Sequence, residues 1–372
     1  MLRALAKTVA AEAVCRTGAD RLLAVRSAPD GAALVLGYHQ VVEDCARNAG
    51  CIPAMLVGVR TLERQLDWVG RRFRFVSLDE LGRLSESGAM GKRPPAVVTF
   101  DDGYRDVYEH AFPLLERKGI PGAVFVVTDL VGTHRLLMHD RLYILIARVL
   151  AQPPSARAGL GRLLDRLGLG VLALEGSRDR GPRDAFAVLR ALLEAVPSTG
   201  LEHLMQAIAP AIGLEDEQFP DLRVLDWDMV RAMHRAGFTI GSHTCSHTLL
   251  TLEGPDRVRL ELAASRRRLE GELGASVRHF VYPDGRFDGA VVDAVAEAGY
   301  GFAYTTCRHR DRRHPLLTVP RRLLWENSCR DTAGRFSPSL MRGQVQGLFD
   351  LFGRCRQDHR PFAVPRPQPA TA

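Results

Sequence analysis

The chain has 372 residues, of which 46% are hydrophobic and 25% charged, as expected for one large globular domain or two smaller ones. Lysine and arginine total 50 and aspartate and glutamate 43, which gives a formal net charge of +7. The basic residues are almost all arginine and are scattered, so we expect no nucleic-acid partner. Seven cysteines without a CxxC pair argue against a disulfide framework or a zinc ribbon and favour a reducing compartment.

Residues 1–30 are predicted to form an N-terminal helical segment. Apolar residues recur there at helical spacing: Leu2, Leu5, Val9 and Ala13. Lys7 and Glu12 interrupt the apolar stretch too early for a signal peptide, and no run in the sequence is long enough to span a bilayer. We therefore expect a cytoplasmic protein or one peripheral to the membrane. The helix could contact a membrane surface or a partner, and packing on its own domain is favoured.

Short apolar strands alternate with amphipathic helices between about residues 31 and 364, the predicted main domain. The expected strands are Ala32–Tyr38, Pro95–Phe100, Ala123–Val127, Phe238–Gly241, Phe280–Tyr282 and Tyr300–Thr305. Helices are expected at Thr61–Arg72, after the capping-box spacing of Ser77 and Glu80, and at about Asp106–Lys118. This alternation predicts parallel strands joined by helical crossovers, in either a barrel or an open doubly wound sheet.

The alternation stops between about residues 131 and 225. The pattern there is helical with proline and glycine joints, which predicts an inserted helical subdomain. It is either a lid over the site or a packing appendage. Residues 365–372 are predicted to be a disordered tail because of their proline-rich composition.

Two adjacent carboxylates follow the strand Pro95–Phe100. Thr99–Gly103 reads TFDDG, so Asp101 and Asp102 stand at the carboxyl end of a buried strand. Ligand sites in parallel α/β architectures lie at that edge. One carboxylate could hold a metal ion while the other accepts a proton. The alternative is an acidic pair that begins a helix.

Two histidines follow the strand Phe238–Gly241. His243 and His247 are four residues apart, which places both imidazoles on one face of a helix, where they can bind one cation. Together with Asp102 they would leave a position for water, as catalytic zinc requires. Cys245 lies between them but points away from that face, so we do not expect it to be a ligand.

Two further segments could contribute to the same site. Phe280–Gly285 (FVYPDG) runs from a strand into a turn that can present backbone N–H groups to a developing oxyanion. His39 ends the strand Ala32–Tyr38. Each has an ordinary structural explanation when taken alone, because many strand-to-helix turns look like the first and many histidines at strand ends are structural.

Together these segments resemble carbohydrate esterase family 4, the polysaccharide deacetylases, which include chitooligosaccharide and poly-N-acetylglucosamine deacetylases. Thr99–Gly103 is similar to the first motif of that family, His243–His247 to its His-Ser/Thr-x-x-His motif and Phe280–Gly285 to its third. Leu36–Val41 (LGYHQV) resembles an N-terminal element of the poly-N-acetylglucosamine deacetylase branch, in which the motifs are circularly permuted. The resemblance covers about residues 34–323.

This resemblance implies a distorted α/β barrel of seven or eight β/α units, with the helical insertion between the first and second motifs. It also implies a divalent metal cofactor, with zinc favoured. The site residues that it implies are the metal ligands Asp102, His243 and His247, the general base Asp101, the general acid His39 and, around the substrate and the oxyanion, Tyr282, Pro283 and Asp284.

The chain departs from the family pattern at two positions. Val281 stands where most members have an arginine that orients the catalytic aspartate, and Arg321, in a later Pro-Arg element, is expected to supply that charge. Asp284 replaces an aromatic residue, which would change the wall that binds the sugar.

The resemblance therefore predicts a hydrolase that removes N-acetyl groups from amino sugars of a polysaccharide, such as an exopolysaccharide, or of a lipid-linked glycan. The N-acetylated glycan is the expected partner. One alternative is that the same metal site acts on another amide. Another is a glycan-binding protein without catalysis, which the presence of both Asp101 and Asp102 disfavours.

Overall fold

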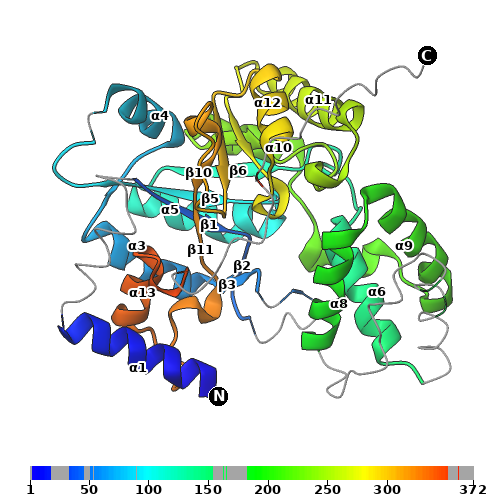
Figure 1. Cartoon of the computed structure of the whole chain (residues 1–372), viewed down its shortest axis with the longest axis horizontal. Coiled ribbons are helices and arrows are strands. Elements are labelled where there is room, and N and C mark those ends of the chain that lie inside the picture. Colours follow the sequence, from blue (N-terminus) through cyan, green and yellow to red (C-terminus); the bar gives the residue numbers. More distant parts are fainter. Residues whose placement is uncertain are drawn as a thin grey trace, which may run out of the picture.

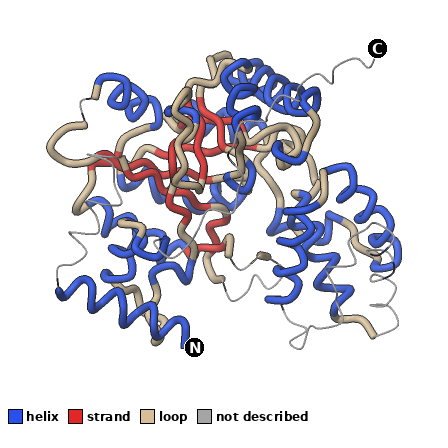
Figure 2. Tube along the Cα trace, viewed as in Figure 1, coloured by secondary structure: helices blue, strands red, loops and turns tan. Residues whose placement is uncertain are grey.

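The computed structural model describes residues 2–17, 33–45, 51–52, 54–88, 90–153, 162, 165, 182–350 and 359. At its centre is a nine-stranded sheet in which every pairing between strands is parallel (Figures 1 and 2). Its strands are β1 (Leu34–Tyr38), β4 (Arg74–Phe75), β5 (Pro95–Phe100), β6 (Gly122–Val126), β7 (Thr239–Ser242), β8 (His279–Val281), β9 (Phe302–Thr305), β10 (Val319–Pro320) and β11 (Arg322–Leu323). Two more strands, β2 (Gln40–Val42) and β3 (Leu56–Gly58), form a separate parallel pair.

The sheet curls into a nearly closed barrel because one extended segment joins its two edges. The order of strands is β10-β9-β8-β7-β6-β5-β1-β11, with β4 attached to β5. Only Arg321 separates β10 from β11, and its N–H donates to the Thr305 carbonyl at 2.7 Å. The N–H of Leu324 donates to the Gly37 carbonyl at 2.9 Å. The prediction of a distorted α/β barrel is confirmed, and the open doubly wound sheet is excluded.

Helices lie outside the sheet, and all of them except the last, which follows the final strand, connect strands (Figure 2). They are α3 (Val59–Gly70), α4 (Leu78–Ser87), α5 (Phe112–Lys118), α10 (Trp227–Arg235), α11 (Pro255–Leu273), α12 (Gly289–Glu297) and α13 (Pro338–Val345). The predicted cap of α4 is present, because the Ser77 hydroxyl accepts a hydrogen bond from the N–H of Glu80 at 3.1 Å. The helix expected from about Asp106 begins instead with a π-helical turn, Val107–Ala111, that leads into α5.

Three helices from the predicted insertion lie together at one side of the barrel (Figure 1). They are α6 (Met138–Leu150), α8 (Pro182–Ala195) and α9 (Ser198–Ile212), and α6 packs against the other two. Leu142 and Leu145 of α6 belong to the same buried core as the barrel strands. The insertion ends beside the turn that follows β5, where the N–H of Leu225 donates to the Gly103 carbonyl at 2.8 Å. The predicted domain limits remain predictions, and the tail 365–372 lies outside the described residues.

The N-terminal helix α1 (Leu2–Thr17) packs against α13. Its buried face differs from the predicted one, because Ala11 is buried whereas Val9 and Ala13 are exposed. The contact with α13, rather than the apolar spacing alone, decides which side of the helix is covered. No helix in the described part of the chain is long and apolar enough to cross a membrane.

Candidate active site

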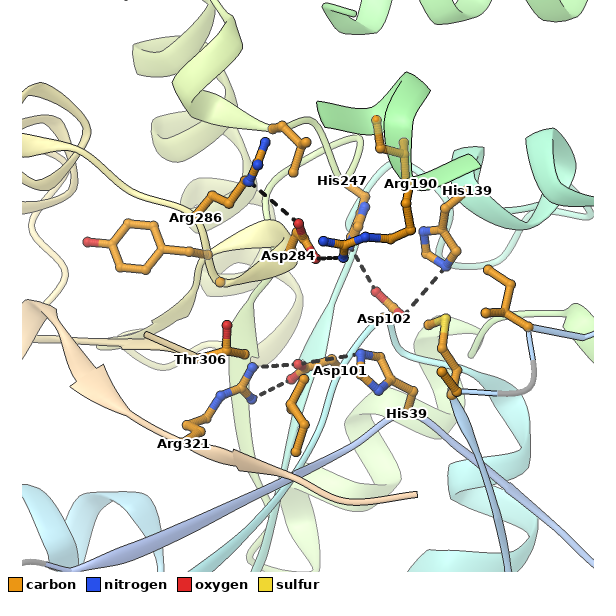
Figure 3. A pocket seen from close by; sticks show the side chains of 18 of the residues that line it. His39, Asp101, Asp102, His139, Arg190, His247, Asp284, Arg286, Thr306 and Arg321 are labelled. Atoms are coloured by element: carbon orange, nitrogen blue, oxygen red, sulfur yellow. Dashed lines mark hydrogen bonds and ion pairs between the residues drawn. The ribbon is translucent and has the colours of Figure 1, made fainter. Parts of the chain in front are cut away.

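A pocket of about 760 Å³ opens at the carboxyl ends of the barrel strands, and most of the predicted site residues line it (Figure 3). From the predicted set these are His39, Asp101, Asp102, His243, His247, Tyr282, Asp284 and Arg321. Parallel strands bring the residues after their last positions to one edge. The pocket therefore gathers side chains that lie more than 280 residues apart in the sequence, from His39 to Arg321.

Asp102, His243 and His247 form a cluster in which one ligand atom from each lies within 4.8 Å of the others. The Nε2 atoms of His243 and His247 are 3.4 and 3.2 Å from Oδ1 of Asp102. Asp102 follows β5 and His243 follows β7, so two strand ends supply this cluster. The sequence placed these three residues together correctly, although not in the right local structure.

The chemistry of these donors fits a divalent cation. Nδ1 of His243 lies 2.9 Å from the Val281 carbonyl, which places the proton of a neutral ring on Nδ1 and leaves a lone pair on Nε2. Among the described residues, neither oxygen of the buried Asp102 has a hydrogen-bond partner of ordinary geometry. A lone pair facing a buried carboxylate is unfavourable unless a cation lies between them. An Asp-His-His set is a usual zinc donor set.

The two histidines lie on a turn, not on the helix that the i, i+4 spacing predicted. Glu261 of α11 holds this turn, because its Oε2 accepts hydrogen bonds from the N–H groups of Cys245 and Ser246 at 2.7 and 3.0 Å. Its Oε1 accepts from the Ser246 hydroxyl at 2.7 Å. Cys245 is buried, and burial raises the pKa of its thiol to about 12, so the thiol stays protonated and is not among the clustered ligands.

Glu261 was not predicted from the sequence. The sequence did contain a weak signal. Glu261 lies three residues after Val258 and one before Leu262, on the side of α11 where these two apolar residues are buried. An acidic residue on the apolar face of a helix indicates a buried partner.

The backbone of the site adopts an uncommon conformation. In the described ranges, the only non-glycine residues with positive φ are Asp102 (70°), Thr244 (68°), His247 (60°) and Asp284 (54°). All four lie in the turns that carry the site. This left-handed conformation is unfavourable for residues with a side chain, so surrounding contacts must hold these turns in place.

Asp101 lines the same pocket and forms a two-point ion pair with Arg321. The guanidinium nitrogens donate to its two oxygens at 2.7 and 2.6 Å, and one of them also donates to the Thr99 hydroxyl at 3.0 Å. Burial alone would raise the pKa of Asp101, but the charge and hydrogen bonds of Arg321 outweigh burial and hold the pKa below its usual value. Asp101 is therefore ionised at neutral pH.

His39 lies beside Asp101, with 4.0 Å between its Nε2 and Oδ2 of the carboxylate. The register of the sheet explains this, because Tyr38 of β1 pairs with Phe100 of β5 and the next residues are therefore neighbours. Burial lowers the pKa of His39, against the opposing effects of Asp102 and Asp101. The imidazole and the carboxylate thus flank the same part of the pocket.

The turn after β8 brings Tyr282 and Asp284 to the pocket. The Tyr282 side chain is fully buried and its hydroxyl donates to the Leu317 carbonyl at 2.9 Å, which leaves only its backbone for the pocket. Pro283 is also buried. The carboxylate of Asp284 pairs with Arg190 of α8 at 2.9 Å and with Arg286 at 3.6 Å. The insertion is thereby tied to this turn.

His139, in the first turn of α6, is a site residue that the sequence analysis missed. Its Nε2 is 3.8 Å from Oδ2 of Asp102 and 3.0 Å from the Tyr104 hydroxyl. Its ring lies edge-on to that of His247, with 4.8 Å between centroids. Burial lowers the pKa of His139 to about 3, so the ring is neutral. No local pattern around residue 139 indicated this position.

Known proteins share this sequence pattern. The family described as polysaccharide deacetylase matches residues 89–165 and 179–303. The poly-beta-1,6-N-acetyl-D-glucosamine N-deacetylase of Staphylococcus epidermidis is 28% identical over 112 residues, which cover 27% of this chain and 38% of that protein. The Escherichia coli K12 protein of the same name is 21% identical over 310 residues, which cover 83% and 39%. The chain therefore spans about two fifths of the length of these relatives.

Solved structures share the fold. The Streptococcus pyogenes deacetylase PplD in complex with acetate superposes with a TM-score of 0.52 at 16% identity, covering 84% of this chain and 97% of that one. IcaB from Ammonifex degensii gives a TM-score of 0.50 at 18% identity, with the same coverage of 84% and 97%. The family match covers more than half of the chain and includes all three motifs. This chain therefore belongs to the polysaccharide deacetylase family.

Proposed function

We propose that this protein is a metal-dependent N-deacetylase that removes acetyl groups from amino sugars of an N-acetylated polysaccharide. The observation that carries the proposal is the pairing, in one pocket, of the Asp102–His243–His247 cluster with Asp101, which Arg321 holds ionised. The two curated relatives, which are N-deacetylases of poly-beta-1,6-N-acetyl-D-glucosamine, support an N-acetyl group as the target. Zinc is the metal that the donor set favours.

A divalent cation held by these three residues would lower the pKa of a water molecule and polarise the acetyl carbonyl. Asp101 then accepts a proton from the water as general base, with Arg321 fixing its orientation. The backbone N–H of Asp284 is assigned to the developing oxyanion. His39, in its protonated form, donates the proton that the departing amine needs. The products are acetate and a free amino sugar.

A lipid-linked glycan is the second candidate substrate. One observation favours it: α8 lines the pocket with three apolar side chains, Phe186, Leu189 and Leu193, beside the charged Arg190 and Glu194. These three apolar side chains could contact a lipid chain beside the sugar. The free polysaccharide remains the first candidate because of the named activity of the relatives.

The test is acetate release from purified protein. N-acetylated glucosamine oligomers and a lipid-linked N-acetylamino sugar are assayed in parallel, with the metal content of the same sample measured by elemental analysis. We expect about one zinc ion per chain, acetate release from the oligomers, and loss of activity after chelation with recovery on adding zinc. Zinc-loaded protein that releases no acetate from either substrate would contradict the proposal.

A further inference from the structure

Three buried side chains form a chain of contacts beside the candidate metal ligand Asp102. His139 and Asp140 come from the first turn of α6, in the helical insertion, and Tyr104 comes from the turn after β5. The Tyr104 hydroxyl donates to Oδ2 of Asp140 at 2.7 Å and lies 3.0 Å from Nε2 of His139. Figure 3 shows the His139 ring directed at Asp102.

The directions of these hydrogen bonds determine which atom carries the proton on His139. The Tyr104 hydroxyl has one proton, and it points at Asp140. Its oxygen can therefore only accept from His139, so the proton of the neutral imidazole lies on Nε2. This N–H edge also faces Oδ2 of Asp102 at 3.8 Å.

The two oxygens of Asp102 consequently have different surroundings. Oδ1 faces the Nε2 atoms of His243 and His247 at 3.4 and 3.2 Å. Oδ2 faces the polarised N–H edge of His139. The backbone of Asp102 has a φ of 70°, so surrounding contacts are needed to hold the turn that carries this carboxylate.

We propose that His139 is a positioning residue for the metal ligand Asp102. It keeps Oδ2 turned toward the insertion and Oδ1 toward the cation, and Tyr104 and Asp140 fix its own ring. The inference rests on the proposed metal site and deepens it: the helical insertion becomes part of the metal centre. Replacing a residue that orients a metal ligand in this way typically lowers the metal affinity about 10- to 100-fold.

The end of the insertion supports this role because it is attached to the same turn. Tyr104 forms an antiparallel bridge with Val224, and the N–H of Arg105 donates to the Arg223 carbonyl at 2.9 Å. The N–H of Gly132 donates to the Leu225 carbonyl at 2.9 Å. Both ends of the insertion are thus tied to the turn that carries Asp102, and α6 has a fixed position relative to it.

The test measures zinc affinity by competition with a chromogenic chelator. His139→Ala should lower the affinity about 10- to 100-fold. His139→Gln, whose amide nitrogen reaches about as far as Nε2, should retain most of the affinity, whereas the shorter His139→Asn should not. The control His134→Ala removes an exposed histidine of the same insertion and should leave the affinity unchanged.

The outcomes separate the two proposals. If the wild-type protein binds no zinc, the proposed function fails. If the wild-type protein binds zinc and folded His139→Ala binds it equally well, the positioning role fails while the proposed function stands. Should His139→Ala not fold, the comparison of Gln with Asn decides, because equal affinities of these two variants would overturn the inference.

Discussion

Asp101 and Asp102 are adjacent in the sequence, yet their side chains have opposite surroundings. Asp101 meets the guanidinium of Arg321, whereas Asp102 faces His243 and His247. The left-handed backbone at Asp102, with a φ of 70°, turns the second carboxylate away from the first. Two chemically identical groups can therefore perform two tasks, proton transfer and metal binding.

Asparagine substitutions should separate these two tasks. Asp102→Asn replaces an anionic ligand by a neutral amide, so the metal content of the purified protein should fall sharply. Asp101→Asn should retain the metal and lower kcat, because only the chemical step loses its base. Elemental analysis and steady-state kinetics on both folded variants check this. Equal metal loss in the two variants would contradict the assignment.

Replacing Arg321 should change the pH dependence of the rate. Burial raises the pKa of Asp101 and Arg321 lowers it, so Arg321→Met leaves burial unopposed and the pKa rises. The base must be ionised to act, so the acidic limb of the kcat/KM profile should move to higher pH. Arg321→Lys keeps a positive charge and should shift the limb less. An unchanged acidic limb in Arg321→Met would mean that another group sets it.

His39→Ala should lose about 10²- to 10⁴-fold in rate on N-acetylated sugars, the usual worth of a positioned acid, while fold and metal content remain. The loss should be smaller on activated aryl acetates, because their leaving groups depart without a proton. Parallel kinetics on the two substrate classes measure the difference. Near wild-type deacetylation of N-acetylated sugars would refute the role of His39 as general acid.

At the scale of the element, helix α11 determines the shape of the loop that carries both histidines. Glu261 is buried and accepts three hydrogen bonds from this loop, while Arg257 compensates its charge at 2.7 Å. The loop contains two left-handed residues, Thr244 and His247, and would not keep this shape without such contacts. The geometry of the candidate metal site therefore depends on a helix that contributes none of the three clustered residues.

Glu261→Gln should weaken both the fold and the metal site. The amide oxygen can still accept from both loop N–H groups, but the amide N–H groups then face the guanidinium of Arg257, donor against donor, in place of Oε1, which should cost about 1–3 kcal/mol. Urea unfolding and zinc titration measure the two effects. The control is Glu272→Gln on the same helix, which breaks only partly exposed ion pairs with Arg231 and Arg268 and should change little. Equal effects of the two substitutions would contradict this role of Glu261.

For the whole molecule, the helical insertion is continuous with the barrel. α6 shares the buried core of the barrel strands. α8 reaches the pocket, where its Arg190 forms an ion pair with Asp284 of the turn after β8. The same segment thus packs into the core and also forms a wall of the pocket.

Removing residues 131–225 should therefore give insoluble or unfolded protein. The deletion exposes the apolar barrel residues that α6 covers. A fold that loses this much apolar burial, and exposes an apolar patch in its place, is expected to unfold or aggregate. Solubility and circular dichroism of the deleted protein measure the outcome. A soluble deletion variant that still hydrolyses small chromogenic acetates would show that the insertion acts as a separable lid.

The sequence predicted those parts of the site that depend on strand order. Residues that follow parallel strands meet at one edge, so the meeting of His39, Asp101, Asp102 and His243 followed from the strand pattern and the motifs. The conformation of the 243–247 turn did not, because the i, i+4 spacing of its histidines also fits a helix. Glu261 and His139 could not be assigned either, since their contacts depend on how distant helices pack.

The four left-handed residues described above have a consequence for the evolution and engineering of this protein. Each costs of the order of 1–3 kcal/mol, and three of them, Asp102, His247 and Asp284, are also assigned to the site. Glycine at position 102 or 247 would relax the backbone while removing a proposed metal ligand, whereas glycine at position 284 would keep the backbone N–H. Selection for heat resistance and selection for catalysis therefore act in opposite directions at Asp102 and His247.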